Sequence, residues 1–409
     1  MTARRALAAL GTALATLLSI ELLLFAAERA SGRVAALLHG TSRALPDARL
    51  GSRPNPALPD HDADGWRNAA RPAQAFAVAI GDSQTYGDEV ARDEAWPQRL
   101  AALTGRSVYG MALGGYGPVE YERLMPEALA LSPQLVLVGL YAGNDFADAY
   151  LSAYPRGLAP ELRSEDAAVV ARVEALERRG ALKDAWERTQ DAVKARRFPR
   201  LSRWFEPIRE RSRIIGLFGA AGRALFASDR QPTSDRVDFD TLRARADAVG
   251  TDWLLPFARG DLSTVFTPAA RLALVDTSDA RIEEGVRIAL LEIRRMAEQC
   301  AGRCRVAVVA IPTKERVFAA FLHASGAALP RAFAELTLRE NLLWERVRRA
   351  LESDQIPLVD TLPRLRAELA AGSNPYFGDW NGHPDTAGNE AIAEAVRASR
   401  LLDAREGAG

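Results

Sequence analysis

The chain has 409 residues, 48% of them hydrophobic, so it can bury one large core, or one core and a smaller unit. Its 53 basic and 53 acidic residues give a net charge of zero, which argues against nucleic acid as a partner. The glycines of Gly114-Gly-Tyr-Gly117 lack the spacing of a dinucleotide-binding loop, and no metal motif is present, so we expect no cofactor.

The N-terminus carries an export signal. Arg4 and Arg5 precede an apolar run from Ala6 to Ala27, and ~20 apolar residues are enough to span a bilayer. The arginines predict that this end stays in the cytoplasm. We favour an uncleaved anchor over a cleaved signal peptide, because Glu28 follows the small residues at the end of the run. The abundance of Ala and Arg over Lys suggests a bacterial source. We therefore expect a single-pass protein of the bacterial inner membrane, held through residues 6–27, with its main domain in the periplasm or outside the cell.

Two features follow from this expectation. Residues 29–72 are rich in Pro, Gly and Asp, and we interpret them as a tether with little regular structure. Within it, Asp64–Asn68 forms a turn that could close over the domain edge.

Cys300 and Cys304 are the two cysteines of the chain. In an oxidising compartment they could form a local disulfide.

The main domain predicts an α/β fold. Short apolar segments that end in turns alternate with amphipathic segments, the pattern of a parallel sheet with right-handed helical crossovers. The expected strands are Phe76–Ile80, Ser107–Met111, Leu135–Tyr141, Arg305–Pro312 and Ile356–Asp360. A terminal helix with Asp385 as its N-cap closes the chain.

We divide the chain accordingly into an anchor (1–28), the tether (29–72), the first half of the core (73–150), an insertion (151–280) and the second half of the core (281–405). The insertion is expected to be mainly helical, with an aromatic loop at Thr251–Pro256. It could form a lid or a wall of a pocket, or a docking surface for a partner.

Candidate site residues follow the predicted strands. Ser83 comes after the first strand, Gly115 after the second, Asn144 after the third and His383 after the last. Because the carboxyl ends of parallel strands meet at one edge of a sheet, we expect these residues to converge. Serine needs a base such as imidazole, and the Ser83 and Gly115 N–H groups and the Asn144 amide could hold an oxyanion. Taken alone, Asn144 could be an ordinary turn residue.

These blocks resemble the SGNH/GDSL hydrolase superfamily. Gly81-Asp82-Ser83 matches its first block, Val108–Gly117 the second, Gly143-Asn144-Asp145 the third, and the loop with His383 the fourth, in the correct order. The resemblance implies a flavodoxin-like three-layer fold, Ser83 as nucleophile, His383 as base, and Ser83, Gly115 and Asn144 as the oxyanion hole. The anchor and Ile311–Lys314 also resemble membrane-anchored bacterial members, some of them related to polysaccharide O-acetylation proteins.

The acid of the triad departs from the family pattern. In the family it usually lies two or three residues before the histidine, where this chain has Asn381 and Trp380. Asp379 is the acidic residue of this loop upstream of His383, and we assign it as the triad acid. A Ser–His dyad supported by a backbone carbonyl is the alternative.

The leading hypothesis is an exported serine esterase that hydrolyses an O-acyl group, such as acetyl on a carbohydrate, or a small acylated molecule. One alternative is an O-acyltransferase for a cell-surface polysaccharide, which would need a membrane partner as acyl donor. The other is a catalytically silent binding or assembly protein on the same fold.

Overall fold

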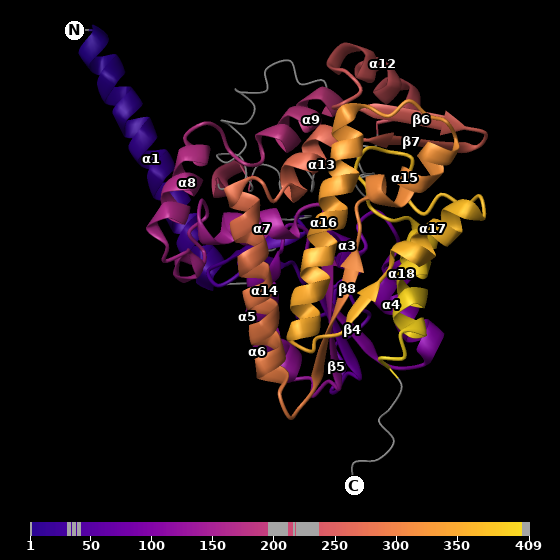
Figure 1. Cartoon of the computed structure of the whole chain (residues 1–409). Helices are drawn as coiled ribbons and strands as arrows, with labels where there is room; N and C mark the ends of the chain where they lie inside the picture. Colours follow the sequence, from indigo (N-terminus) through magenta and orange to yellow (C-terminus); the bar gives the residue numbers. More distant parts are fainter. Residues whose placement is uncertain are drawn as a thin grey trace.

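The computed structural model describes residues 2–30, 34, 38, 42–194, 212–215, 217 and 237–402. A central sheet lies between two layers of helices (Figure 1). Its five strands are all parallel and lie in the order β4, β3, β5, β8, β9. Numbered along the chain, this order is 2-1-3-4-5, that of flavodoxin-like sheets, and the predicted fold class is confirmed. The strands are β3 (Ala77–Gly81), β4 (Val108–Ala112), β5 (Leu135–Tyr141), β8 (Arg305–Ile311) and β9 (Leu358–Asp360).

The central strands are apolar throughout because helices cover both faces of the sheet. All seven residues of β5 are buried: Val136 and Val138 face one layer of helices, and Leu135 and Leu137 face the other. The first layer contains α5 (Pro118–Arg123), α6 (Met125–Leu129), α7 (Asp145–Ala153), α14 (Ala280–Cys300) and α16 (Arg331–Ser353). The second contains α4 (Trp96–Thr104), α15 (Lys314–Ala324), α17 (Leu362–Ala370) and α18 (Thr386–Ala398).

The short helix α3 (Ser83–Tyr86) lies unusually close to the sheet. Gly81 of β3 and Gly139 of β5 are paired in register, and Thr85 of α3 packs over both. A Cβ at Gly81 would lie 2.1 Å from Thr85 Oγ1, and one at Gly139 would lie 2.2 Å from the same atom. The two glycines therefore allow the chain to turn immediately after β3, which sets the position of Ser83.

The predicted tether is more structured than its composition indicated. β1 (Ala44–Asp47) and β2 (Gly51–Pro54) form an antiparallel hairpin. Trp66 is buried against the core, and Asn68 exchanges two 2.9 Å hydrogen bonds with the backbone of Gly110 on β4. Asn68 thus satisfies polar groups of an edge strand, so the turn at Asp64–Asn68 does close over the domain edge. The expectation of little regular structure was wrong for residues 44–54.

The insertion between β5 and β8 is mainly helical where the structure describes it. Its helices after α7 are η2 (Pro160–Leu162), α8 (Ala167–Glu177), α9 (Asp184–Lys194), α12 (Phe239–Val249) and α13 (Pro268–Val275). The aromatic loop predicted at Thr251–Pro256 instead leads into an antiparallel hairpin of β6 (Leu255–Arg259) and β7 (Leu262–Phe266). A small separate core joins α9, α12 and the hairpin. Residues 195–211, 216 and 218–236 of the predicted insertion lie outside the described residues, as do 31–33, 35–37 and 39–41 of the predicted tether.

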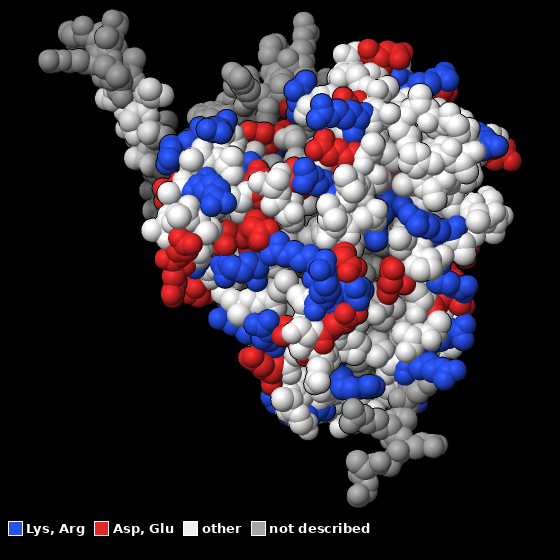
Figure 2. Space-filling view, viewed as in Figure 1, with Lys and Arg blue, Asp and Glu red and all other residues white. Residues whose placement is uncertain are grey.

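The N-terminal helix α1 (Thr2–Ala30) points away from the body of the molecule (Figure 1). Its segment Ala8–Ala30 has 23 residues and a mean hydropathy of 1.9, and its most apolar part is not buried against the rest of the protein. It is therefore long and apolar enough to cross a membrane, and a signal sequence can have the same length and composition. On the face shown in Figure 2, basic and acidic side chains are interspersed rather than gathered by sign.

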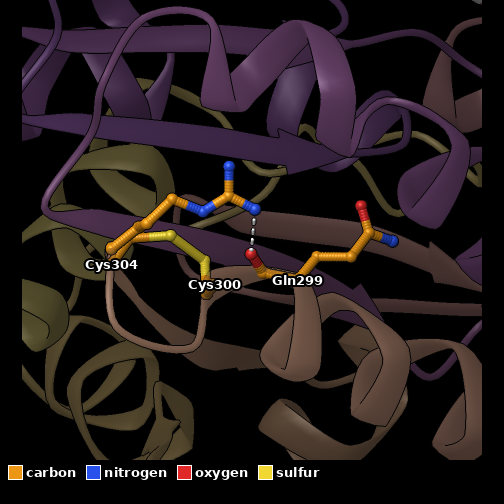
Figure 3. Close-up of a disulfide and its surroundings, with 4 residues drawn as sticks. Gln299, Cys300 and Cys304 are labelled. Carbon is orange, nitrogen blue, oxygen red and sulfur yellow. Dashed lines mark hydrogen bonds between the residues drawn. A yellow bond between two sulfur atoms is a disulfide. The ribbon is translucent and has the colours of Figure 1, made fainter.

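A disulfide joins Cys300 at the end of α14 to Cys304, the local pairing that we considered for an exported chain (Figure 3). Within the same turn, the Arg303 guanidinium donates a 2.8 Å hydrogen bond to the Gln299 carbonyl. The turn leads directly into β8, so the crosslink lies at the amino end of the sheet, opposite the edge that carries the predicted site.

Candidate active site

Ser83 lies at the carboxyl edge of the sheet, where β3 passes into α3. Asp82 is the N-cap of α3, and its Oδ1 accepts a 2.9 Å hydrogen bond from the Gln84 N–H. This cap fixes the turn and leaves the Ser83 side chain partly exposed. Burial raises the pKa of Asp82 to about 6, against the opposing effects of the Gln84 N–H and of His383. Ser83 lines a pocket of about 270 Å³.

His383 lies in the loop between α17 and α18, 300 residues from Ser83 in sequence. The structure brings the two together: His383 Nε2 is 3.0 Å from Ser83 Oγ. A β-bridge between Tyr376 and Pro384 and the N-cap of α18 by Asp385 hold this loop. The fold therefore brings the His383 imidazole within hydrogen-bond distance of the Ser83 hydroxyl.

Acidic side chains surround the imidazole. Burial lowers the pKa of His383, but the Glu89, Asp88 and Asp82 carboxylates outweigh burial, and the net pKa lies above the ordinary 6.5. Asp88 Oδ2 is 4.0 Å from Nε2, and Glu89 Oε1 is 3.6 Å from Nδ1. We expected no role for either acid from the sequence. The feature of the sequence that could have pointed to them is their position, five and six residues after Ser83.

Asp379 is buried, and its carboxylate is hydrogen-bonded within its own loop rather than to His383. Its Oδ1 accepts a 2.9 Å hydrogen bond from the Asn381 N–H, and its own carbonyl accepts a 2.5 Å bond from Lys314 Nζ. Within the described chain, no hydrogen bond or ion pair joins its carboxylate to His383. Lys314 also donates to the Val265 carbonyl, so it ties the His383 loop to β7. Burial lowers the pKa of Lys314 to about 8, against the effect of Asp379. A triad acid needs a hydrogen bond to the imidazole. Among the described residues the Asp379 carboxylate makes no such bond to His383.

The predicted oxyanion donors line the same pocket. Gly115 has a φ of +87°, and a Cβ there would meet open space. In the described part of the chain, neither the Ser83 nor the Gly115 N–H donates to another protein group. The Asn144 amide is held by carboxylates: Nδ2 is 2.9 Å from Asp148 Oδ2 and 3.3 Å from Asp82 Oδ2. Its role as an oxyanion donor stays a prediction.

The insertion supplies one wall of the pocket, which is one of the arrangements that we considered from the sequence. Lys183, Trp186, Arg271 and Leu274 come from it. The Trp186 ring lies against Trp380 of the His383 loop, with centroids 5.2 Å apart, and the Arg271 guanidinium lies 4.5 Å from the Trp186 ring centre. Arg271 also donates to the Gly143 and Asn381 carbonyls. It therefore links the loops that carry Asn144 and His383, a role that no sequence motif indicated.

The comparisons with known proteins concern the fold. No family model matches the chain, and no curated protein matches it. Among solved structures, it is similar to an acetyl xylan esterase with 9% identity and a TM-score of 0.35, over 80% of this chain and 100% of that one. It is also similar to an α/β hydrolase from the metagenome of Lake Arreo, Spain (11% identity, TM-score 0.33, 82% and 99% covered). A third likeness is to a protein of Parabacteroides merdae described as a GDSL-like lipase (10%, TM-score 0.30, 81% and 99%). Likenesses at this level do not identify a reaction.

Proposed function

We propose that the protein is a serine ester hydrolase of the SGNH type. The observation that carries this proposal is the 3.0 Å approach of Ser83 Oγ to His383 Nε2 at the edge of a pocket. In the proposed mechanism His383 takes the Ser83 proton as Oγ attacks the ester carbonyl. The Ser83 and Gly115 N–H groups and the Asn144 amide stabilise the oxyanion. His383 then protonates the leaving alcohol, and water releases the acid from Ser83.

The substrate class proposed is a short O-acyl ester on a polar carrier, such as an acetylated carbohydrate. A pocket of about 270 Å³ is small and suits a short acyl group. The carrier of that group would extend out of the pocket into solvent. The Trp186 side chain lines the same pocket as Ser83, and Lys183 and Arg271 add polar groups. These features favour a short acyl group attached to a sugar over a long lipid chain.

We further propose that the site acts outside the cytoplasm, on a domain tethered to the bacterial inner membrane by residues 6–27. The apolar helix α1 and the disulfide between Cys300 and Cys304 support this location, since disulfides persist in oxidising compartments. Proteolysis of intact spheroplasts tests it: an exported domain is digested without lysis, whereas protection of the domain contradicts the proposal.

The chemistry is tested on the full-length protein in detergent with a fluorophosphonate probe and a p-nitrophenyl acetate assay. We expect an adduct on Ser83 and ester hydrolysis, both reduced at least about 10³-fold in Ser83→Ala and in His383→Ala. Ser353→Ala, at an exposed serine on α16, is the matched control and should behave as wild type. A folded wild-type protein that neither forms the adduct nor hydrolyses the ester contradicts the proposed function.

A further inference from the structure

The second nitrogen of the catalytic imidazole needs a partner. His383 Nε2 faces Ser83, and a base that accepts a proton there carries its own hydrogen on Nδ1. A carboxylate on the Nδ1 side holds that tautomer and stabilises the imidazolium that forms. Nδ1 is buried and has no hydrogen-bond partner of ordinary length among the described residues.

Glu89 is placed to be that partner. Its Oε1 lies 3.6 Å from Nδ1, longer than a finished hydrogen bond, but catalytic hydrogen bonds are often long without substrate. The other carboxylates that face the ring lie elsewhere: Asp88 approaches Nε2 and is paired with Arg43, and Asp82 caps α3 beside Ser83. Within the described chain, Glu89 provides the carboxylate within 4 Å of Nδ1.

The Glu89 side chain is oriented from the His383 loop itself. Asn381 Nδ2 donates a 2.8 Å hydrogen bond to the same Oε1. Asn381 stands two residues before His383, so one short loop supplies both the imidazole and the amide that steadies its carboxylate.

The backbone of Glu89 is costly to maintain. Its φ is +74°, in the left-handed region that glycine adopts freely and other residues rarely adopt. Strain of this kind persists where the surrounding structure imposes it, and it clusters at functional sites. A glycine would satisfy this backbone but would remove the carboxylate.

We propose that Glu89 is the positioning carboxylate for His383, and that it takes the place in the catalytic group that the sequence analysis gave to Asp379. This inference rests on the proposed Ser83 hydrolase. In it, Asp379 shapes the loop through the Asn381 N–H and leaves the imidazole to Glu89.

The test compares Glu89→Gly and Glu89→Gln with Asp379→Asn in the full-length protein. Loss of the carboxylate should lower kcat for p-nitrophenyl acetate by about 10²- to 10⁴-fold with little change in KM. Asp379→Asn keeps an acceptor for the Asn381 N–H and should retain most activity. Glu89→Gly should not lower the Tm, because it relieves the positive φ. Gln355→Gly, at a residue with φ of +57° elsewhere in the fold, controls for that relief and should leave kcat unchanged.

A second readout does not depend on turnover. The carboxylate favours the charged imidazole, so its removal should lower the pKa of His383, followed by NMR of labelled histidine and assigned with His383→Ala. The acid limb of kcat/KM should move to lower pH with it. In Glu89→Gly/Asn381→Asp, a carboxylate returns from the neighbouring side chain, and activity and the raised pKa should be partly restored.

The outcomes separate the two proposals. If wild type is inert at Ser83, the proposed function fails, and the His383 titration still decides the placement: a fall of the pKa in Glu89→Gly supports Glu89, and an unchanged pKa overturns it. If wild type is active, full activity in both Glu89 variants together with its loss in Asp379→Asn overturns this assignment in favour of Asp379.

Discussion

The contact between α14 and α7 is expected to control both stability and the position of Asn144. Gly285 of α14 packs directly on the α7 backbone, and a Cβ there would lie 1.9 Å from the Phe146 carbonyl oxygen and 2.8 Å from its carbon. Ordinary contact begins near 3.4 Å, and backbone cannot rotate away as a side chain can. Gly285→Ala must therefore push the two helices apart.

Two opposing terms set the magnitude. Replacing a helical glycine with alanine favours the helix by about 1 kcal/mol. Overpacking a core costs about 1–3 kcal/mol, and a collision with backbone belongs at the upper end of that range. The net destabilisation should be about 2 kcal/mol, with a Tm lower by several degrees. Because α7 begins immediately after Asn144, kcat should fall by more than the loss of folded protein explains.

Thermal and denaturant unfolding followed by circular dichroism measure the first effect, and the ester assay measures the second. Glu298→Ala, on the exposed face of α14, is the control and should change the stability by less than about 0.5 kcal/mol. A Gly285→Ala variant as stable as wild type, or more stable, would refute the reasoning, because helix propensity would then outweigh the collision.

Two further predictions concern the oxyanion hole and the disulfide. Asn144→Ala should lower kcat by about 10²- to 10³-fold with little change in KM in steady-state ester hydrolysis; an unchanged kcat would mean that the amide only anchors its loop to Asp148. The Cys300→Ser/Cys304→Ser double variant should lose up to about 2 kcal/mol in denaturant unfolding, because the crosslink closes a short loop. Reductant should lower the unfolding midpoint of wild type and not that of the double variant, and a wild-type midpoint insensitive to reductant would contradict this.

The fold was predictable because its signals are local. β3, β5 and β8 are apolar runs that end in turns, and helical periodicity lies between them, so the pattern and the topology rules predict a parallel sheet. The flavodoxin-like arrangement came from the family resemblance. The hairpins β1–β2 and β6–β7 were missed for the opposite reason. Their strands have four or five residues, and β1, β2 and β6 each contain a proline. The hairpins are stabilised by packing on the core or on the insertion rather than by their own sequence.

The candidate site divides in the same way. Ser83, Gly115 and Asn144 were expected to lie together because each follows a strand, and parallel strands deliver such loops to one edge. His383 was expected there too, but in the structure α17 lies between β9 and its loop. The partner of His383 could not be found by spacing within one loop. It depends on where the Glu89 carboxylate and the Asn381 amide meet in space, across 292 residues of chain.

The amino-acid sequence by itself determined the sheet, the positions of the serine and the histidine, and the apolar N-terminal helix, because hydrophobic period and turn residues act over a few neighbours. The tertiary structure alone decided which acid faces the imidazole and that Arg271 links the two site loops. It also decided that the insertion forms a pocket wall. These depend on distances between loops that no local pattern encodes, and a shift of one ångström there changes which side chains can act together.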